Sequence, residues 1–307
     1  MWLWLLASIW GASYMLIKIG LRDLSAPMVA CVRIALAAAV LVPLAASQQA
    51  LGAVRGRGGT VALVAAVQVA APFLLISLGE QEISSALAGI LVATAPIFTA
   101  VLAILVDHEE RSEGVRLLGI VLGIAGVAAL FGLDLSGSGS LVLGGLAIVL
   151  AGLGYAVGGF LVKHRLGDAP PIGVAAWVMV ASTIWLLPAA LATAPDSAPA
   201  LGPVAAVTAL GVVGTGLAFA IFYTLMARVG PARSFIVAYL APGFAVAYGA
   251  ILLDERITVA TVAGLALILA GSWLAVEGGS IPGRRGEAAA PLDSARRPAP
   301  SAGRPGT

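Results

Sequence analysis

Ten apolar segments follow one another along this chain, and each is close to the length that a helix needs to cross a bilayer. A helix rises about 1.5 Å per residue, so about 20 apolar residues span the hydrocarbon core. Hydrophobic residues make up 60% of the 307 residues and charged residues 10%, against roughly 25% charged in a soluble domain. This composition predicts an all-α integral membrane protein. The ten predicted spans are roughly 2–19, 27–46, 60–79, 84–106, 115–132, 142–162, 171–193, 201–226, 232–253 and 258–276.

The two halves of the chain repeat each other at an offset of 145 or 146 residues. The stretch Trp-Gly-Ala-Ser-Tyr-Met-Leu-Ile-Lys at 10–18 aligns with Tyr-Ala-Val-Gly-Gly-Phe-Leu-Val-Lys at 155–163. Further matches, in the same order, are 84–96 with 230–242, Glu110-Arg111 with Glu255-Arg256, and Gly119 and Gly126 with Gly264 and Gly271. A duplicated polytopic membrane protein is typical of transporters whose site lies between two repeats.

Five spans in each repeat is an odd number, which has a topological consequence. The second repeat must enter the membrane from the side opposite to the first, so the two repeats are predicted to be inverted. We expect one five-helix repeat over residues 1–135 and a second over 140–278. Residues 279–307 are rich in Pro, Gly, Ala and Arg and are predicted to form a disordered basic tail, because they cannot bury enough apolar surface to fold.

The distribution of Lys and Arg predicts which side of the membrane each loop faces. Cytoplasmic loops carry an excess of these residues. With the N-terminus inside, the inside loops and the tail hold 13 of the 17 basic residues, whereas the outside loops hold only Arg22 and Arg256. Both termini are therefore predicted to be cytoplasmic. In this topology Glu80 and Glu82 lie outside.

Pro96 and Pro242 occupy equivalent positions near the middle of their predicted spans. A proline inside a helix removes one hydrogen bond and clashes with the preceding turn, which lipid tolerates only where protein or water covers the freed carbonyl. Gly243 loosens the turn at Pro242 further. Matched breaks at mid-membrane indicate a transport site, so we expect these three residues to act as kinks or gates. The alternative is that the prolines only shape helix packing.

Several aromatic residues lie at mid-membrane rather than in the interfacial belts where Trp and Tyr usually collect. A buried Tyr hydroxyl or Trp N–H needs a hydrogen-bond partner, and a wet cavity would supply one. Tyr155 takes the place of Trp10 in the second repeat. The predicted substrate-binding residues of this kind, with one serine on the same helix face, are Trp10, Ser13, Tyr14, Tyr155, Phe219 and Tyr223. Packing contacts between helices are the alternative for each of them.

Three further side chains are candidates because they are polar inside a span. Gln68 is the only amide deep in a span, and an unpaired amide in hydrocarbon is costly. Tyr239 lies near the break at Pro242, and Tyr248 must point to the opposite face of the same helix. Arg33 is the one basic residue clearly inside a span. It could bind a substrate carboxylate through its planar fork, or it could cap carbonyls or reach the outer headgroups.

No metal, cofactor or enzymatic chemistry is expected. No Asp or Glu lies in the middle of a predicted span, so the usual carboxylate relay for protons is missing. Consecutive residues rarely converge on one ion, so we interpret Asp107-His108-Glu109-Glu110 as a solvated loop. Walker A, HExxH and GxSxG sequences do not occur. The expected partners are a small-molecule substrate and membrane lipids, with no nucleic acid at a net charge of +2. Gly-x-x-x-Gly pairs in two spans leave both a monomer and a homodimer open.

The doubled motifs, in this order, resemble those of EamA-type transporters in the drug/metabolite transporter superfamily. The residues that carry the resemblance are Trp10 to Lys18, Arg33, Pro96, Glu110 and Gly119 to Gly126, with Pro242, Glu255 and Gly264 to Gly271 in the second half. The resemblance covers residues 1–278. It implies a ten-helix, inverted-repeat carrier in a bacterial cytoplasmic (inner) membrane, often one that exports amino acids or related small metabolites. The second repeat has no arginine equivalent to Arg33.

The predicted function is a secondary transporter that exports a small organic metabolite, such as an amino acid or a related carboxylated compound, by alternating access. The alternatives are a membrane-embedded enzyme acting on a lipid-linked substrate and a small-solute channel. An enzyme would need a convergent acid, nucleophile or metal site, and a channel would usually show a filter or a ring of like charges.

Overall fold

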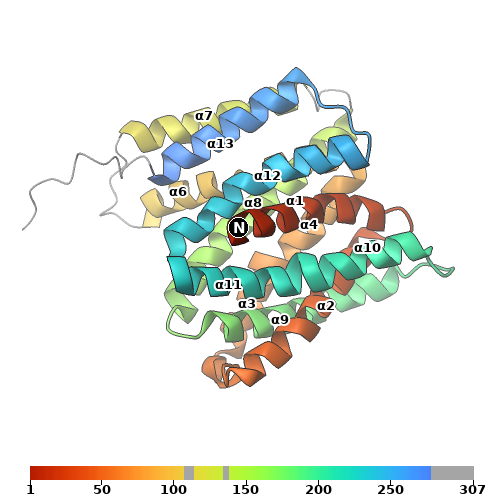
Figure 1. The fold of residues 1–307 in the computed structure, drawn as a ribbon, viewed down its shortest axis with the longest axis vertical. Helices are drawn as coiled ribbons and strands as arrows, with labels where there is room; N and C mark the ends of the chain where they lie inside the picture. The colour runs from red at the N-terminus through yellow and green to blue at the C-terminus, as the bar shows by residue number, and fades with distance from the viewer. Residues whose placement is uncertain (107–113, 134–137, 278–307) are drawn as a thin grey trace, which may run out of the picture.

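A computed structural model of the protein describes residues 1–106, 114–133 and 138–277, and within these ranges the chain consists of helices without any strand. The predicted loop Asp107–Glu110 and the predicted tail 279–307 lie outside the described residues. Nine helical segments in the described ranges are long and apolar enough to cross a membrane, and the tenth contributes the apolar helix Ile236–Leu252. The chain is therefore a multi-pass, all-α membrane protein (Figure 1).

The ten predicted spans are all present. In chain order the helices are α1 (Trp2–Gly20), α2 (Ala26–Ser47), a short η1 (Leu51–Val54), α3 (Gly58–Val64), η2 (Ala65–Ala70), α4 (Ala71–Glu82), α5 (Ser85–Val92), α6 (Ala95–Val106), α7 (Gly114–Leu133), α8 (Gly139–Leu166), α9 (Pro171–Ala192), α10 (Leu201–Gly211), η3 (Val212–Leu217), α11 (Ala218–Val229), α12 (Pro231–Leu252) and α13 (Val259–Glu277). Three of the spans are composite: α3–η2–α4, α5–α6 and α10–η3–α11.

The third and eighth spans each contain a π-helical segment at equivalent positions of the two repeats. These segments are η2, which begins at Ala65, and η3, which begins at Val212. A π-turn shifts the backbone hydrogen bonds by one residue and often occurs at functional sites. Ser182 of α9 donates a hydrogen bond to the Ala65 carbonyl at 3.1 Å, and Thr215 donates to the Leu210 carbonyl at 2.9 Å. Hydroxyls therefore satisfy carbonyls at both irregular segments.

The two matched prolines have different structural settings. The fourth span is interrupted at Ala93 and Thr94, and Pro96 lies in the first turn of α6, where its missing N–H leaves no hydrogen bond unmade. Ser272 of α13 donates to the Ala93 carbonyl at 2.9 Å. In the ninth span, α12 runs unbroken through Pro242, and Gly243 is exposed with open space where a Cβ would be. The fold thus contains one broken and one continuous proline helix, and their gating role stays a prediction.

Equivalent helices of the two halves meet each other, as two inverted repeats require. The second span packs on the seventh (α2 on α9) and the fifth on the tenth (α7 on α13). Likewise α1 packs on α12, as its counterpart α8 packs on α5 and α6. Figure 1 shows α7 and α13 side by side along one edge of the bundle, with α2 and α9 at the opposite edge.

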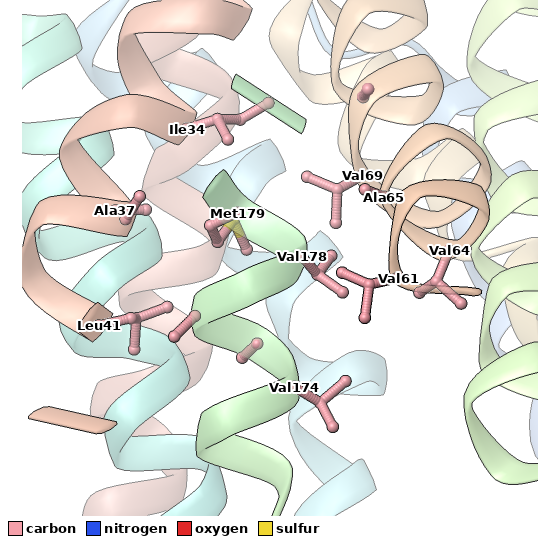
Figure 2. Packing of buried hydrophobic residues seen from close by; sticks show 14 of the residues in the cluster. Ile34, Ala37, Leu41, Val61, Val64, Ala65, Val69, Val174, Val178 and Met179 are labelled. Carbon is pink, nitrogen blue, oxygen red and sulfur yellow. The ribbon is translucent and has the colours of Figure 1, made fainter. Parts of the chain in front are cut away.

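Alanine, valine, isoleucine and leucine side chains make up most of the largest buried cluster, between α2, α9 and the α3–η2 segment. Figure 2 shows Ile34 and Leu41 of α2 meeting Met179 of α9, with Val61 and Val69 on the other side. This cluster also supports the partly buried rings of Tyr155, Phe219 and Tyr223. The core of the bundle therefore positions aromatic residues that the sequence singled out.

Both Gly-x-x-x-Gly pairs serve packing within the chain. A Cβ added at Gly119 would lie 2.4 Å from the Ala275 backbone nitrogen, and one at Gly271 would lie 2.4 Å from the Gly123 nitrogen. On α8, a Cβ at Gly158 would lie 2.3 Å from the Gln68 Cβ. Small residues allow such close approach of helix backbones in membranes. These glycine faces are thus already covered by helices of the same chain.

The alternating spans define two ends of the bundle. We call the distal end the one formed by the loops 21–25, 83–84, 193–200 and 253–258, and the proximal end the one formed by 48–57 and 167–170. Distal loops are joined by a hydrogen bond from the Ala200 N–H to Asp23 at 2.8 Å. At the proximal end Arg57 and Asp168 form an ion pair at 2.6 Å. The hydrogen bond from Arg57 holds the pKa of the Asp168 carboxyl below its usual value.

Replacing Gly119 by alanine should destabilise the protein. The added Cβ would press on the α13 backbone, and overpacking of this kind costs about 1–3 kcal/mol. Gly132 is the matched control, since it lies on the same helix with nothing within 4 Å of an added Cβ. Thermal unfolding in detergent should show a lower midpoint for Gly119→Ala and a parent-like midpoint for Gly132→Ala. Equal midpoints would contradict the close contact of α7 with α13.

Candidate functional site

Arg33 is a buried cation in the middle of the bundle. It lies on α2, whose first turn is capped by Ser25, and its side chain is 8% exposed. Its Nε–H donates to the Thr215 hydroxyl of η3 at 2.8 Å. Its guanidinium carbon lies 4.0 Å from the centre of the Phe73 ring on α4, a cation–π distance. The side chain is therefore held within the bundle, against Thr215 and Phe73.

Glycines of the eighth span bring Arg33 within reach of Thr215. A Cβ at Gly211 would lie 2.9 Å from the Arg33 carbonyl oxygen, and one at Gly216 would lie 2.8 Å from the Val40 Cβ. The backbones of α2 and η3 can approach this closely only because both positions lack a side chain. The Thr215 hydroxyl is fully buried and accepts from Arg33 while it donates to the Leu210 carbonyl.

Most hydrogen-bond donors of the Arg33 guanidinium have no partner among the described residues. Guanidinium carries five N–H donors, and among the described residues only the Nε–H makes a hydrogen bond. Arg33 interacts electrostatically with Tyr14 and Tyr155, both half-buried, and with Glu80. The two terminal nitrogens form a planar fork that matches a carboxylate.

Two aromatic pairs, related by the repeat, flank this region. Trp10 of α1 meets Phe219 of α11 edge-on at 6.1 Å, and Tyr155 of α8 meets Phe73 of α4 edge-on at 6.4 Å. In each pair the first residue occupies the same place in its repeat. Tyr223 extends the first pair by packing on Phe219 at 5.9 Å. The structure therefore gathers Trp10, Phe219 and Tyr223 into one cluster and places Tyr155 with Phe73 beneath Arg33.

Gln68 and Thr215 occupy equivalent positions in the two π segments, but only Thr215 has a polar partner. The Gln68 side chain is half-buried against Gly158 of α8, and its amide makes no hydrogen bond to the described residues. The position equivalent to Arg33 is Val178, which is 4% exposed in the core. The hydrogen-bonded pair of Arg33 and Thr215 therefore has no equivalent pair at the symmetry-related positions, Val178 and Gln68.

Two further predicted binding residues make no hydrogen bond to Arg33 in the described part of the chain. The hydroxyl of Ser13 donates to the Ile9 carbonyl at 3.2 Å and is 4% exposed, against η3. Tyr239 lines an apolar groove of about 490 Å³ between α12 and α13 together with Trp273, whose ring is 51% exposed. Tyr248, on the other face of α12, bonds Ser8 of α1 at 2.6 Å. Ser13 therefore packs on the segment that carries Thr215, whereas Tyr239 lines the groove between α12 and α13; the part of both in binding stays a prediction.

Sequence analysis missed two residues beside Arg33. Phe73 was not singled out because a phenylalanine in an apolar span carries no distinguishing signal. Glu80 was expected at the outer end of the third span and was not considered for the site; it lies in the last turn of α4, its side chain is 0% exposed, and neither carboxyl oxygen has a hydrogen-bond partner among the described residues. Its place at the end of α4, directly after a glycine that packs on α8, was the only available signal. The described residues contain no cluster of His, Cys, Asp and Glu that could hold a metal.

Comparison with known proteins places this geometry in a family context. The EamA-like transporter family matches residues 1–132 and 142–276. A protein of Escherichia coli (strain K12), named a probable amino-acid metabolite efflux pump, is 27% identical over 285 residues, which cover 89% of this chain and 93% of that protein. A protein of Streptantibioticus cattleyicolor, named a probable terminal-alkyne amino-acid exporter, is 28% identical over 92% of this chain and 94% of that protein.

A solved crystal structure shares the fold. It superposes with a TM-score of 0.64 at 17% sequence identity and covers 89% of this chain and 94% of that one. At this level of identity the likeness concerns the helix arrangement alone.

Replacing Thr215 by valine should destabilise the protein by about 1–3 kcal/mol, because it leaves the buried Arg33 Nε–H without an acceptor. Thr215→Ser keeps the hydroxyl and should restore most of the loss. Thr208→Val is the matched control, since the Thr208 hydroxyl is exposed and bonds only its own helix. Thermal unfolding in detergent measures all three. A Thr215→Val midpoint equal to that of Thr208→Val would rule out a structural bond to Arg33.

Proposed function

This chain belongs to the EamA-like transporter family, and we propose that it exports an amino acid or a closely related carboxylated metabolite, held by Arg33. It is a multi-pass membrane transporter of small metabolites rather than an enzyme. The proposal adds the substrate class, the direction of transport and the residue that recognises the substrate.

The open fork of Arg33 is the observation that carries this proposal. A guanidinium inside a membrane is unfavourable unless its charge and donors are satisfied. Thr215 and Phe73 fix one edge and one face of the group, which leaves the terminal nitrogens oriented but unbonded. A substrate carboxylate would satisfy them with two parallel charge-assisted hydrogen bonds. Holding the fork in place beforehand lowers the entropy that binding would otherwise lose.

The aromatic residues fit the remainder of such a substrate. Tyr14 and Tyr155 lie close enough to Arg33 to interact with its charge and offer hydroxyls that could orient an amine or a second polar group. Trp10 and Phe219 provide apolar walls. Two relatives are named for amino-acid metabolites and terminal-alkyne amino acids, and both compound classes carry a carboxylate. These names support the proposed substrate class.

Alternating access is the proposed transport cycle, and the asymmetry between the repeats supports it. In inverted-repeat carriers the two repeats exchange conformations as the site changes its access. The fourth span is broken before Pro96, whereas the ninth is continuous through Pro242. In the opposite state we expect the ninth span to break beside Pro242 and Gly243 while the fourth straightens. The described residues form neither a ring of like charges nor a filter-like segment, the features that would favour a channel.

The proposed location is a bacterial cytoplasmic membrane, with the proximal end of the bundle facing the cytoplasm. By the sequence count, the side of the membrane that holds residues 48–57 and 167–170 has, together with the tail, 13 of the 17 basic residues, in keeping with the excess of Lys and Arg on the cytoplasmic side. Export then moves the substrate from the proximal to the distal end.

Arg33 variants test the substrate class. In purified protein reconstituted into vesicles, Arg33→Gln should lower kcat/KM for a carboxylated amino acid by about 10–100-fold, as expected for loss of charge-assisted hydrogen bonds. The matching amino-acid amide should be much less affected. Arg33→Lys should fall between, because it keeps the charge without the fork. An unchanged acid-to-amide ratio in folded Arg33→Gln protein would refute carboxylate recognition.

Cysteine labelling tests the orientation. Cys31 is 4% exposed and should stay silent towards a membrane-impermeant maleimide. Asp196→Cys places a thiol in the exposed distal loop, and Gly52→Cys places one at the proximal end with open space around it. In intact cells the Asp196→Cys protein should react, whereas Gly52→Cys should react only after permeabilisation. The reverse pattern would invert the proposed topology.

A further inference from the structure

Glu80 is a buried carboxyl group that the substrate site leaves unexplained. It lies near the distal end of α4, its side chain is 0% exposed, and both of its carboxyl oxygens lack a hydrogen-bond partner among the described residues. A gap of this kind is unusual, because buried polar groups are nearly always paired. An ionised carboxylate in this position would carry the full penalty of a buried, unpaired charge.

No charged group near Glu80 forms a hydrogen bond or ion pair with its carboxyl oxygens among the described residues. The titratable side chains close to it are Lys18 and Tyr14 of α1, Arg33 of α2, and Glu255 of the loop before α13. The Lys18 ammonium donates to the backbone carbonyls of Glu80 and Ile83 rather than to the carboxyl group. Arg33 bonds Thr215. A carboxylate this close to an ammonium would be expected to pair with it, so the geometry suits a neutral carboxyl.

Glu255 closes the distal end directly above this group. Its carboxylate accepts hydrogen bonds from the Ser85 and Ala86 N–H groups at 2.7 and 3.0 Å, at the positive end of α5. This contact joins the second half of the chain to the first. The Ser85 hydroxyl beneath it is buried without a partner. Opening the distal end would break these bonds and admit water to Glu80.

We propose that Glu80 is a proton-binding site that is protonated while the distal end is closed and ionises when that end opens. A hydrated glutamate is ionised at neutral pH, so opening releases one proton to the distal side and closing takes one up. The closed state binds the proton, so acid favours closure. As the pH increases, the ratio of open to closed protein rises by up to about tenfold per pH unit. The inference deepens the proposed function, because it makes the opening step of export depend on a proton. It rests on the proposed function only in taking distal opening to be a step of export.

Infrared spectroscopy of substrate-free protein in lipid tests the bound proton. At pH 7 the parent should show a protonated-carboxyl C=O band that is absent from Glu80→Gln. Glu82→Gln is the matched control, two residues along and exposed, and should keep the band. Identical spectra for the three proteins at this frequency would overturn the proposal. No substrate is involved, so a failure of the Arg33 test would leave this result standing.

A reporter thiol tests the link to opening. Ala86 is 1% exposed beneath the Glu255 contact, so Ala86→Cys in a Cys31→Ser background should react with an impermeant maleimide only when the distal end opens. The same thiol is also measured in a protein that carries Glu80→Gln in addition. Dividing the first alkylation rate by the second removes the pH dependence of the thiol itself. From pH 6 to 8 this ratio should rise by up to about tenfold per unit, and adding Glu82→Gln instead should leave the parent rate unchanged. A ratio that stays constant with pH would overturn the coupling, whatever the protein transports.

Discussion

In hydrocarbon every backbone N–H and C=O must find its partner inside the protein, and this requirement decides where the bundle can be irregular. The interruptions of regular α-helix within the spans coincide with hydroxyl groups that satisfy backbone carbonyls there. Ser182 serves Ala65 at η2, Thr215 serves Leu210 at η3, and Ser272 serves Ala93 at the break in the fourth span. Thr215 does this while also accepting from Arg33. One side chain thus satisfies an irregular stretch of backbone and holds the arginine that we propose as the substrate-binding residue.

The sequence was sufficient for the spans and for the inverted architecture, because apolar length and repeat spacing are one-dimensional signals. It could not show the π segments, since helices that are apolar on all sides lose the periodicity that reports a change of phase. Arg33 and Gln68 stood out because polar residues are rare in lipid-spanning segments, but their different surroundings depend on contacts across the bundle. Phe73 gave no signal because a phenylalanine is an ordinary residue in an apolar span.

The differences from expectation follow the same division. Glu80 was expected in an outer loop because it follows the last apolar residue of a span, whereas the packing of α4 on α8 and α1 buries its side chain within the bundle. Tyr239 was chosen by its distance along the chain from Pro242, and it lines a groove between α12 and α13; its part in binding stays a prediction. The limits of the two repeats and the nature of the tail remain predictions. The two repeats have the same helix arrangement, but their polar residues differ. Arg33 has no counterpart in the second repeat, since Val178 occupies the equivalent position in the core.

The hydrogen bond from Ser272 to Ala93 has a consequence for how the protein is made. It joins residues 179 positions apart. The carbonyl at the break of the fourth span therefore has no Ser272 donor until the last span has been synthesised. At roughly 5–20 residues per second this delay is on the order of ten to forty seconds. In that interval the unfinished fourth span has an unsatisfied carbonyl inside the bilayer, which favours its retention beside the insertion machinery. A chain that ended before α13 would lose a peripheral helix and also the means to complete a central one.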